Sequence, residues 1–117
     1  MSWRDSLTAA GVDTDTGIAQ VGGDPAFYRE ALALFLAENA RRIPAMKAAA
    51  PEDLVRPAHG LKSDCRTLGA AACGDLAARL ERAARDGDDA AVQTVLPELL
   101  AKTEQLDAAI RAALEQT

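Results

Sequence analysis

The sequence predicts an all-α fold: an antiparallel up-down four-helix bundle with a short N-terminal helical lid. Alanine is abundant and aromatic residues make up only 3% of the 117 residues, a composition typical of helical chains. Apolar residues recur at helical spacing in four separate stretches. Glycine, proline and aspartate residues separate these stretches by short connections, and short connections make consecutive helices antiparallel neighbours.

The first bundle helix is expected to follow Gly22-Gly23, which ends a short N-terminal element. Asp24 is a candidate N-cap, and Pro25 suits the first helical position. We expect Pro44 to kink this helix or weaken its last turn. Its core-facing stripe would consist of Tyr28, Ala31, Leu32, Phe35, Asn39, Ile43 and Met46.

A short connection over residues 47–51 leads to the second helix, expected over 52–68 and ended by Gly69 as a left-handed cap. The third helix is expected over 71–85. Its inward-facing residues would be Cys73, Leu76, Ala77, Leu80 and Ala84.

The run Asp86-Gly87-Asp88 predicts a stop and a restart, because Gly87 tolerates positive φ and Asp88 or Asp89 can cap a new helix. This fourth helix is the longest, and Pro97 should bend it. Its apolar stripe would be Val92, Val95, Leu96, Leu99, Leu100, Thr103, Leu106, Ile110 and Leu114.

Residues 1–21 are too short to supply a fifth bundle helix. We expect them to fold over one end as a lid of one or two short helices, using Trp3, Leu7, Val12, Ile18 and Val21. With the bundle over 24–115, this makes residues 1–117 a single domain.

Charge and hydropathy exclude several functions. The net charge of −5 makes nucleic acid or an anionic membrane a poor partner. No apolar run approaches the ~20 residues that span a bilayer. Residues 1–11 lack the apolar centre of a signal peptide, so we expect a cytoplasmic protein.

Cys65 and Cys73 are expected to be small, reduced core residues. On one continuous helix their spacing corresponds to a rise of about 12 Å, too far for a disulfide. Two thiols and one histidine on another face are also too few for a metal site, so none is expected.

His59 is the only histidine and lies in the run Ala58-His59-Gly60-Leu61-Lys62-Ser63. At about 100° per residue, it shares an outward face with three cations, which are Arg56, Lys62 and Arg66. The opposite, core-facing side would be formed by Leu54, Leu61, Cys65, Leu68 and Ala72. Gly60 should leave the backbone open to an approaching partner.

This face suits phosphoryl transfer. A neutral imidazole nitrogen is a competent nucleophile near neutral pH. A transferring phosphoryl group carries charge on its equatorial oxygens, and Lys62, one turn from His59, can neutralise part of it. A positive stripe on an acidic protein also suits docking to an acidic partner, with Arg56, Gly60, Ser63 and Arg66 as the candidate docking residues.

Motifs along the chain carry a family resemblance. They are Gly11-Val12-Asp13, Gly22-Gly23-Asp24-Pro25, Tyr28, Leu34-Phe35-Leu36, the run over 58–63, Leu68-Gly69-Ala70, Leu80-Glu81 and Gly87-Asp88. Over about residues 11–115, the chain resembles the histidine-containing phosphotransfer (HPt) domains of two-component phosphorelays.

The resemblance implies a phosphocarrier rather than an enzyme, with no ATP site or cofactor of its own. His59 would take a phosphoryl group from a receiver's aspartyl phosphate and pass it to another receiver's aspartate, and Lys62 would contact the phosphoryl oxygens. The partners would be response-regulator receiver domains or a hybrid histidine kinase, and the receiver would supply Mg²⁺. We expect a monomer, because the apolar stripes are buried within one chain.

Three residues depart from the family pattern. Asp64 stands where a small residue is usual, at the core edge, and is expected to pair with Arg79 or Arg82. Arg66 also replaces a usually small residue on the docking face, which would alter partner choice. Pro57 requires either that the helix begins near it or that the helix kinks there, and a kink is the preferred interpretation.

Three alternatives remain. A bundle of this kind could act only in binding, although the intact His59–Lys62 pair argues against that. A histidine-kinase dimerisation domain would need a following ATP-binding domain with glycine-rich loops, absent from these 117 residues, and would leave the last two helices unexplained. A carboxylate-type metal bundle needs inward glutamates and a Glu-x-x-His pattern, whereas His59 is expected to face outward.

Overall fold

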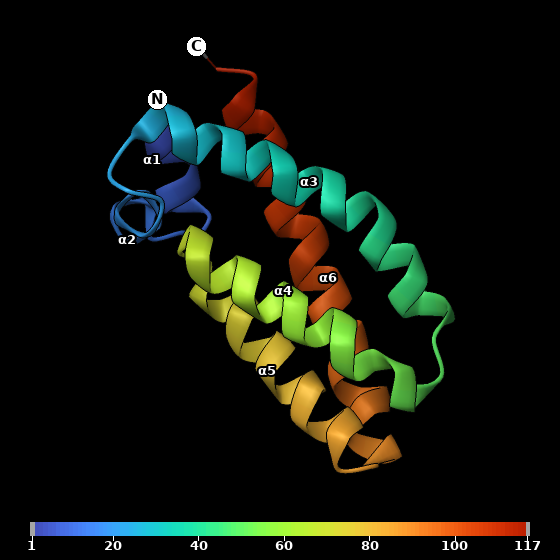
Figure 1. The fold of residues 1–117 in the computed structure, drawn as a ribbon. Helices are drawn as coiled ribbons and strands as arrows, with labels where there is room; N and C mark the ends of the chain where they lie inside the picture. The colour runs from blue at the N-terminus through green and yellow to red at the C-terminus, as the bar shows by residue number, and fades with distance from the viewer. Residues whose placement is uncertain (1, 117) are drawn as a thin grey trace.

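A computed structural model describes residues 2–116, which form helices and no strand. The elements are α1 (Trp3–Ala9), α2 (Thr14–Gln20), α3 (Pro25–Ala48), the 3-10 turn η1 (Pro51–Leu54), α4 (Val55–Leu68), α5 (Ala71–Arg85) and α6 (Asp89–Leu114). Figure 1 shows α3 to α6 running alternately down and up the long axis of the molecule. The predicted all-α fold is confirmed.

Helix α3 begins as the sequence predicts and ends later. The Asp24 carboxylate accepts a hydrogen bond from the Ala26 N–H at 2.9 Å, and Pro25 occupies the first turn. The helix continues past Pro44 to Ala48, so the expected connection over 47–51 is too long. Only two residues, 49 and 50, separate α3 from η1.

The start of α4 corrects the interpretation of Pro57. The α-helix begins at Val55, directly after η1, so Pro57 lies in its first turn rather than at a kink in its interior. A first-turn proline is tolerated because N–H groups there have no partner within the α-helix. At the other end Gly69 has a φ of 87°, and its N–H donates to the carbonyl of Arg66, as expected of a left-handed cap.

The turn at Gly69 also corrects the reasoning about the two cysteines. Cys65 belongs to α4 and Cys73 to α5, so they do not share one continuous helix. Both are buried and free, and Cys73 Sγ lies 3.3 Å from the Thr103 hydroxyl. Ala72, placed on the core face by extending the α4 pattern past the turn, is exposed.

Helices α5 and α6 follow the expected bounds. α5 ends at Arg85, and the Asp88 side chain then caps α6 by accepting a hydrogen bond from the Ala91 N–H at 3.1 Å. With 26 residues, α6 is the longest helix described, and it continues through Pro97.

A polar network joins α3, α4 and α6 inside the bundle. Arg42 of α3 donates to the Asn39 side chain and, at 2.9 Å, to the Asp64 carboxylate of α4. Asn39 in turn donates to Asp107 of α6 at 2.9 Å, and burial raises the pKa of that carboxyl. Asp64 therefore pairs with Arg42 and not with Arg79 or Arg82, because its position at the core edge turns it toward α3.

The N-terminal lid consists of two short helices. Its residues Leu7, Val12 and Ile18 are buried in the same core as the bundle side chains. The Asp13 N–H donates to the carbonyl of Gly69 at 2.9 Å, which ties the lid to the turn between α4 and α5.

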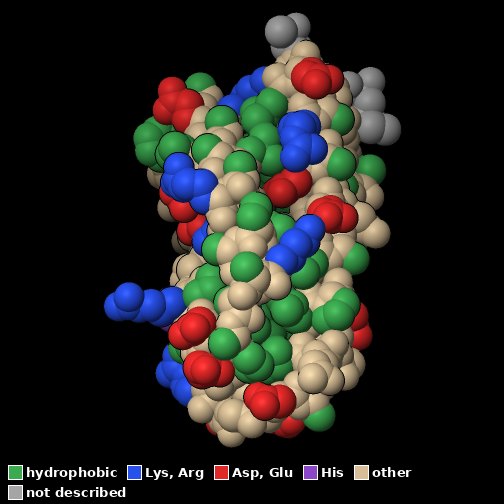
Figure 2. Space-filling model, turned by 90° about the vertical axis from the view of Figure 1, so that its right-hand side faces the viewer, with side chains coloured by type: hydrophobic (Ala, Val, Ile, Leu, Met, Phe, Trp, Pro, Cys, Tyr) green, Lys and Arg blue, Asp and Glu red, His purple; other side chains and the backbone are tan. Residues whose placement is uncertain are grey.

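Most large apolar side chains lie inside the bundle; Phe27 and Leu34 on α3 are the exposed ones in the described chain. Figure 2 views the right-hand side of Figure 1, where hydrophobic and charged side chains intermingle and no histidine is visible. No helix within residues 2–116 has both the length and the apolarity needed to cross a membrane.

Candidate functional site

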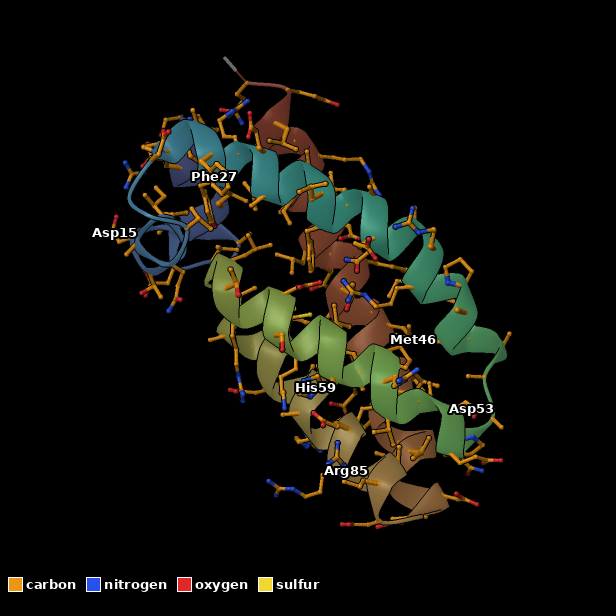
Figure 3. The ribbon with its side chains drawn as sticks, viewed as in Figure 1. Asp15, Phe27, Met46, Asp53, His59 and Arg85 are labelled. Atoms are coloured by element: carbon orange, nitrogen blue, oxygen red, sulfur yellow. The ribbon has the colours of Figure 1, made fainter. Side chains whose placement is uncertain are left out.

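The site is built on the outer face of the hairpin formed by α4 and α5. The His59 side chain is 59% exposed in the second turn of α4, while its neighbours Ala58 and Leu61 are fully buried. Figure 3 labels His59 on α4 and Arg85 on α5. The amphipathic pattern of α4 thus holds the imidazole at the surface on a rigid helix.

A single carboxylate from α5 organises this face. Glu81 Oε2 accepts hydrogen bonds from His59 Nδ1 at 3.1 Å and from Arg85 Nη2 at 2.6 Å. Lys62 Nζ lies 2.7 Å from the other oxygen, Oε1. The Glu81 side chain is only 10% exposed, so three partners from two helices meet at a largely buried charge.

The charge state of Glu81 sets the tautomer of His59. The hydrogen bond from Lys62 lowers the pKa of the Glu81 carboxyl, and the bond to His59 acts in the same direction, against the effect of burial. An ionised carboxylate only accepts hydrogen bonds. His59 Nδ1 therefore carries the proton, and in the neutral ring Nε2 carries the lone pair.

The candidate docking residues occupy different environments. Arg56, Ser63 and Arg66 are exposed on α4. Gly60 is only partly exposed, and a Cβ added there would lie 3.1 Å from Nη1 of Arg42. Arg42 from α3 therefore lies beside Gly60, and the docking role of this partly exposed glycine stays a prediction.

Arg66 extends over α5 beside a groove of about 310 Å³. A Cβ added at Gly74 of α5 would come 3.3 Å from the Arg66 Cγ, so this glycine makes room for the arginine's aliphatic stem. The groove is lined by Lys62, Arg66, Ala78, Glu81, Arg82 and Arg85. Four cations and one carboxylate thus make this groove positive, although the whole chain is acidic.

The residue pattern of α4 alone does not point to Glu81 or Arg85, which lie on α5. Leu80-Glu81 served only as a family motif, with no role for the carboxylate. The signal that identifies them is the turn at Gly69, since His59 and Glu81 lie at similar distances along the chain on either side of it. Antiparallel helices joined by a short turn bring such residues opposite one another.

Residues 2–116 contain no group of three or more His, Cys, Asp or Glu side chains placed to hold a metal ion. The face presents an exposed imidazole that is hydrogen-bonded to a carboxylate, and two cations bind the same carboxylate.

Comparison with known proteins identifies the family of this chain. A model of the Hpt domain matches residues 30–116, which include Glu81 and all the side chains bonded to it. No curated protein and no solved structure matches the chain. Members of this family are phosphotransfer modules of two-component signalling that interact with receiver domains and histidine kinases. They are phosphocarriers rather than enzymes with their own ATP site. Because the match covers most of the chain, the protein belongs to the Hpt domain family.

Proposed function

We propose that this chain relays a phosphoryl group between receiver-domain aspartates through a phosphohistidine at His59. The observation that carries the proposal is the bond from His59 Nδ1 to Glu81. This bond fixes the ring of an exposed side chain and leaves Nε2 as the nucleophilic nitrogen.

In the proposed transfer, the Nε2 lone pair attacks the phosphorus of an aspartyl phosphate on the receiver. The N–P bond forms as the P–O bond to the aspartate breaks, and the aspartate leaves with the electron pair as a carboxylate. The imidazole becomes positively charged while Nδ1 keeps its proton, and the ionised Glu81 beside it stabilises that charge. Transfer to a second receiver is the reverse of this step.

Lys62 is proposed to contact the phosphoryl oxygens. Its ammonium group lies on Glu81 Oε1, and its side chain is 20% exposed, so a rotation about its flexible stem suffices to reach a group bound to His59. We propose that Mg²⁺ and the remaining catalytic groups come from the receiver.

We also propose that the chain acts as a monomer. Of its large apolar side chains within the described residues, two are exposed, Phe27 at 52% and Leu34 at 68%. A stable homodimer interface needs about 800 Å² from each partner with an apolar centre, which two such side chains do not provide.

The proposed function is tested by incubating the chain with a panel of separately phosphorylated receiver domains. We expect at least one receiver to lose its phosphate to the chain faster than by its own hydrolysis, and the phosphorylated chain to load the aspartate of a receiver. If the receivers bind the chain but none exchanges phosphate with it, the domain serves only in binding and the relay is excluded.

Replacing Glu81 tests the role of its carboxylate. In Glu81→Ala the imidazole loses its acceptor, so we expect transfer to slow by roughly tenfold, or ~1.4 kcal/mol of barrier. Glu81→Gln keeps an acceptor without the charge and should retain more of the rate. The ¹⁵N chemical shifts of the imidazole report the tautomer directly. Equal rates and an unchanged Nδ1–H tautomer in Glu81→Ala would remove Glu81 from the mechanism.

Reversing Arg66 tests the docking role of the groove. Arg66 lies two turns of α4 beyond His59, and the aliphatic part of its side chain packs against α5. We therefore place its charge at the edge of the docked partner rather than on the phosphoryl group. In single-turnover kinetics, Arg66→Glu should raise the half-saturating receiver concentration several-fold and weaken its salt dependence, with little change in the limiting rate. A collapse of the limiting rate at unchanged half-saturation would contradict this role.

A further inference from the structure

Arg85 is held close to His59, because both side chains bond to the same carboxylate oxygen of Glu81. It lies in the last turn of α5, one turn after Glu81, and bonds to the same Oε2 that accepts from His59. Its Nη2 and the imidazole Nδ1 are therefore no farther apart than two hydrogen bonds laid end to end, 2.6 Å and 3.1 Å. The Arg85 side chain is 62% exposed, so it is free to move on the protein surface.

The charge around Glu81 is unbalanced. The single carboxylate of Glu81 pairs with Lys62 through Oε1 and with Arg85 through Oε2, which leaves a surplus positive charge beside the imidazole. Arg66 and Arg82 add to this surplus in the same groove. A phosphoryl group attached to nitrogen brings close to two negative charges and strong acceptor oxygens, which would offset the surplus.

We propose that Arg85 is a second phosphoryl-binding residue, held beside His59 by Glu81 before transfer and turning onto the phosphoryl oxygens once they arrive. This inference rests on the proposed phosphohistidine at His59. Lys62 and Arg85 bind opposite oxygens of Glu81, so they reach the phosphoryl group from two directions. The planar guanidinium can contact two of its oxygens at once, which the lysine ammonium does less well.

Phosphorylation by a small chemical donor separates this inference from the relay. Potassium phosphoramidate phosphorylates accessible histidine without a receiver, and the chain offers one histidine. The ³¹P chemical shift of the phosphorylated chain, followed against pH, gives the pKa of the phosphoryl group. A cation in contact with the dianion lowers this pKa, and its loss raises it.

The variants compared are Arg85→Ala, Arg85→Lys and, as the matched control, Arg82→Ala. Arg82 lies on the same helix and lines the same groove but makes no hydrogen bond or ion pair with Glu81 within residues 2–116. We expect Arg85→Ala to raise the phosphoryl pKa clearly above that of the control, with Arg85→Lys in between. At equilibrium with a phosphorylated receiver, Arg85→Ala should lower the phosphorylated share of the chain by about fivefold.

Two outcomes would overturn the role of Arg85. The first is that Arg85→Ala and Arg82→Ala titrate alike. The second is that Arg85→Ala lowers only the thermal midpoint, as expected of an ordinary helix-surface ion pair. If Arg85 shifts the titration but no receiver exchanges phosphate with the wild-type chain, the proposed relay fails and the phosphoryl contact stands.

Discussion

A His59→Gln variant is expected to accept no phosphoryl group from any receiver that phosphorylates the wild-type chain. The variant has no imidazole, and the chain has no second histidine to replace it. An amide nitrogen is not a nucleophile at neutral pH, because its lone pair is delocalised into the carbonyl. The loss of transfer should therefore be complete rather than partial.

The fold of this variant should change little. The His59 side chain is 59% exposed, and the glutamine amide can donate to the same oxygen of Glu81. Far-UV circular dichroism and the thermal midpoint provide the control. Transfer itself is followed with labelled phosphate, using the acid lability that distinguishes phosphohistidine from phosphoserine. Acid-labile phosphate on the His59→Gln chain would exclude His59 as the acceptor.

The largest effect on stability is expected from Gly69→Ala, at roughly 3–4 kcal/mol. Gly69 has a φ of 87°, in the left-handed region that costs other residues about 1–2 kcal/mol. An added Cβ would also collide with the backbone of Asp13, since its carbonyl oxygen and carbon would both lie under 3 Å away. Relieving this collision pushes the lid from the turn and weakens the bond from the Asp13 N–H.

Gly87→Ala is the matched control. Gly87 follows α5 as Gly69 follows α4, and its φ of 69° is also left-handed, but an added Cβ would meet no atom within 4 Å. Gly87→Ala should therefore lower the free energy of unfolding by only about 1–2 kcal/mol, which is the contribution of the left-handed backbone alone. Urea unfolding of both variants measures the difference. Equal losses of stability would show that the lid does not press on the turn at Gly69.

The sequence was sufficient for the features that depend on neighbouring residues. Asp24 and Asp88 cap the helices they were expected to cap, and Gly69 ends α4 in the predicted left-handed conformation. Caps and turns form between residues a few positions apart, so residue type and spacing determine them. The exposure of His59 follows for the same reason, because one helix defines its own apolar face.

The sequence was not sufficient for contacts between side chains of different helices. The partner of Asp64 is Arg42, which is supplied by the packing of α3 on α4, and this register cannot be obtained from α4 alone. Glu81 is the most important case, since its role arises only when α5 folds back along α4 and brings a carboxylate to His59. The prediction for Pro57 was wrong for a different reason, because residues 52–54 were assigned to this α-helix, whereas they belong to a separate 3-10 turn that precedes it.

If Glu81 holds the proton on Nδ1 of His59, the phosphoryl group of the proposed relay is accepted on Nε2. A long-range ¹H–¹⁵N correlation spectrum of the ¹⁵N-labelled chain, recorded before and after phosphorylation by a receiver, tests it most directly, since the chain contains a single imidazole. We expect a protonated Nδ1 in both spectra and coupling of phosphorus to Nε2 in the second. A phosphorus coupled to Nδ1, or an imidazole whose nitrogens do not change while the chain gains phosphate, would contradict this expectation.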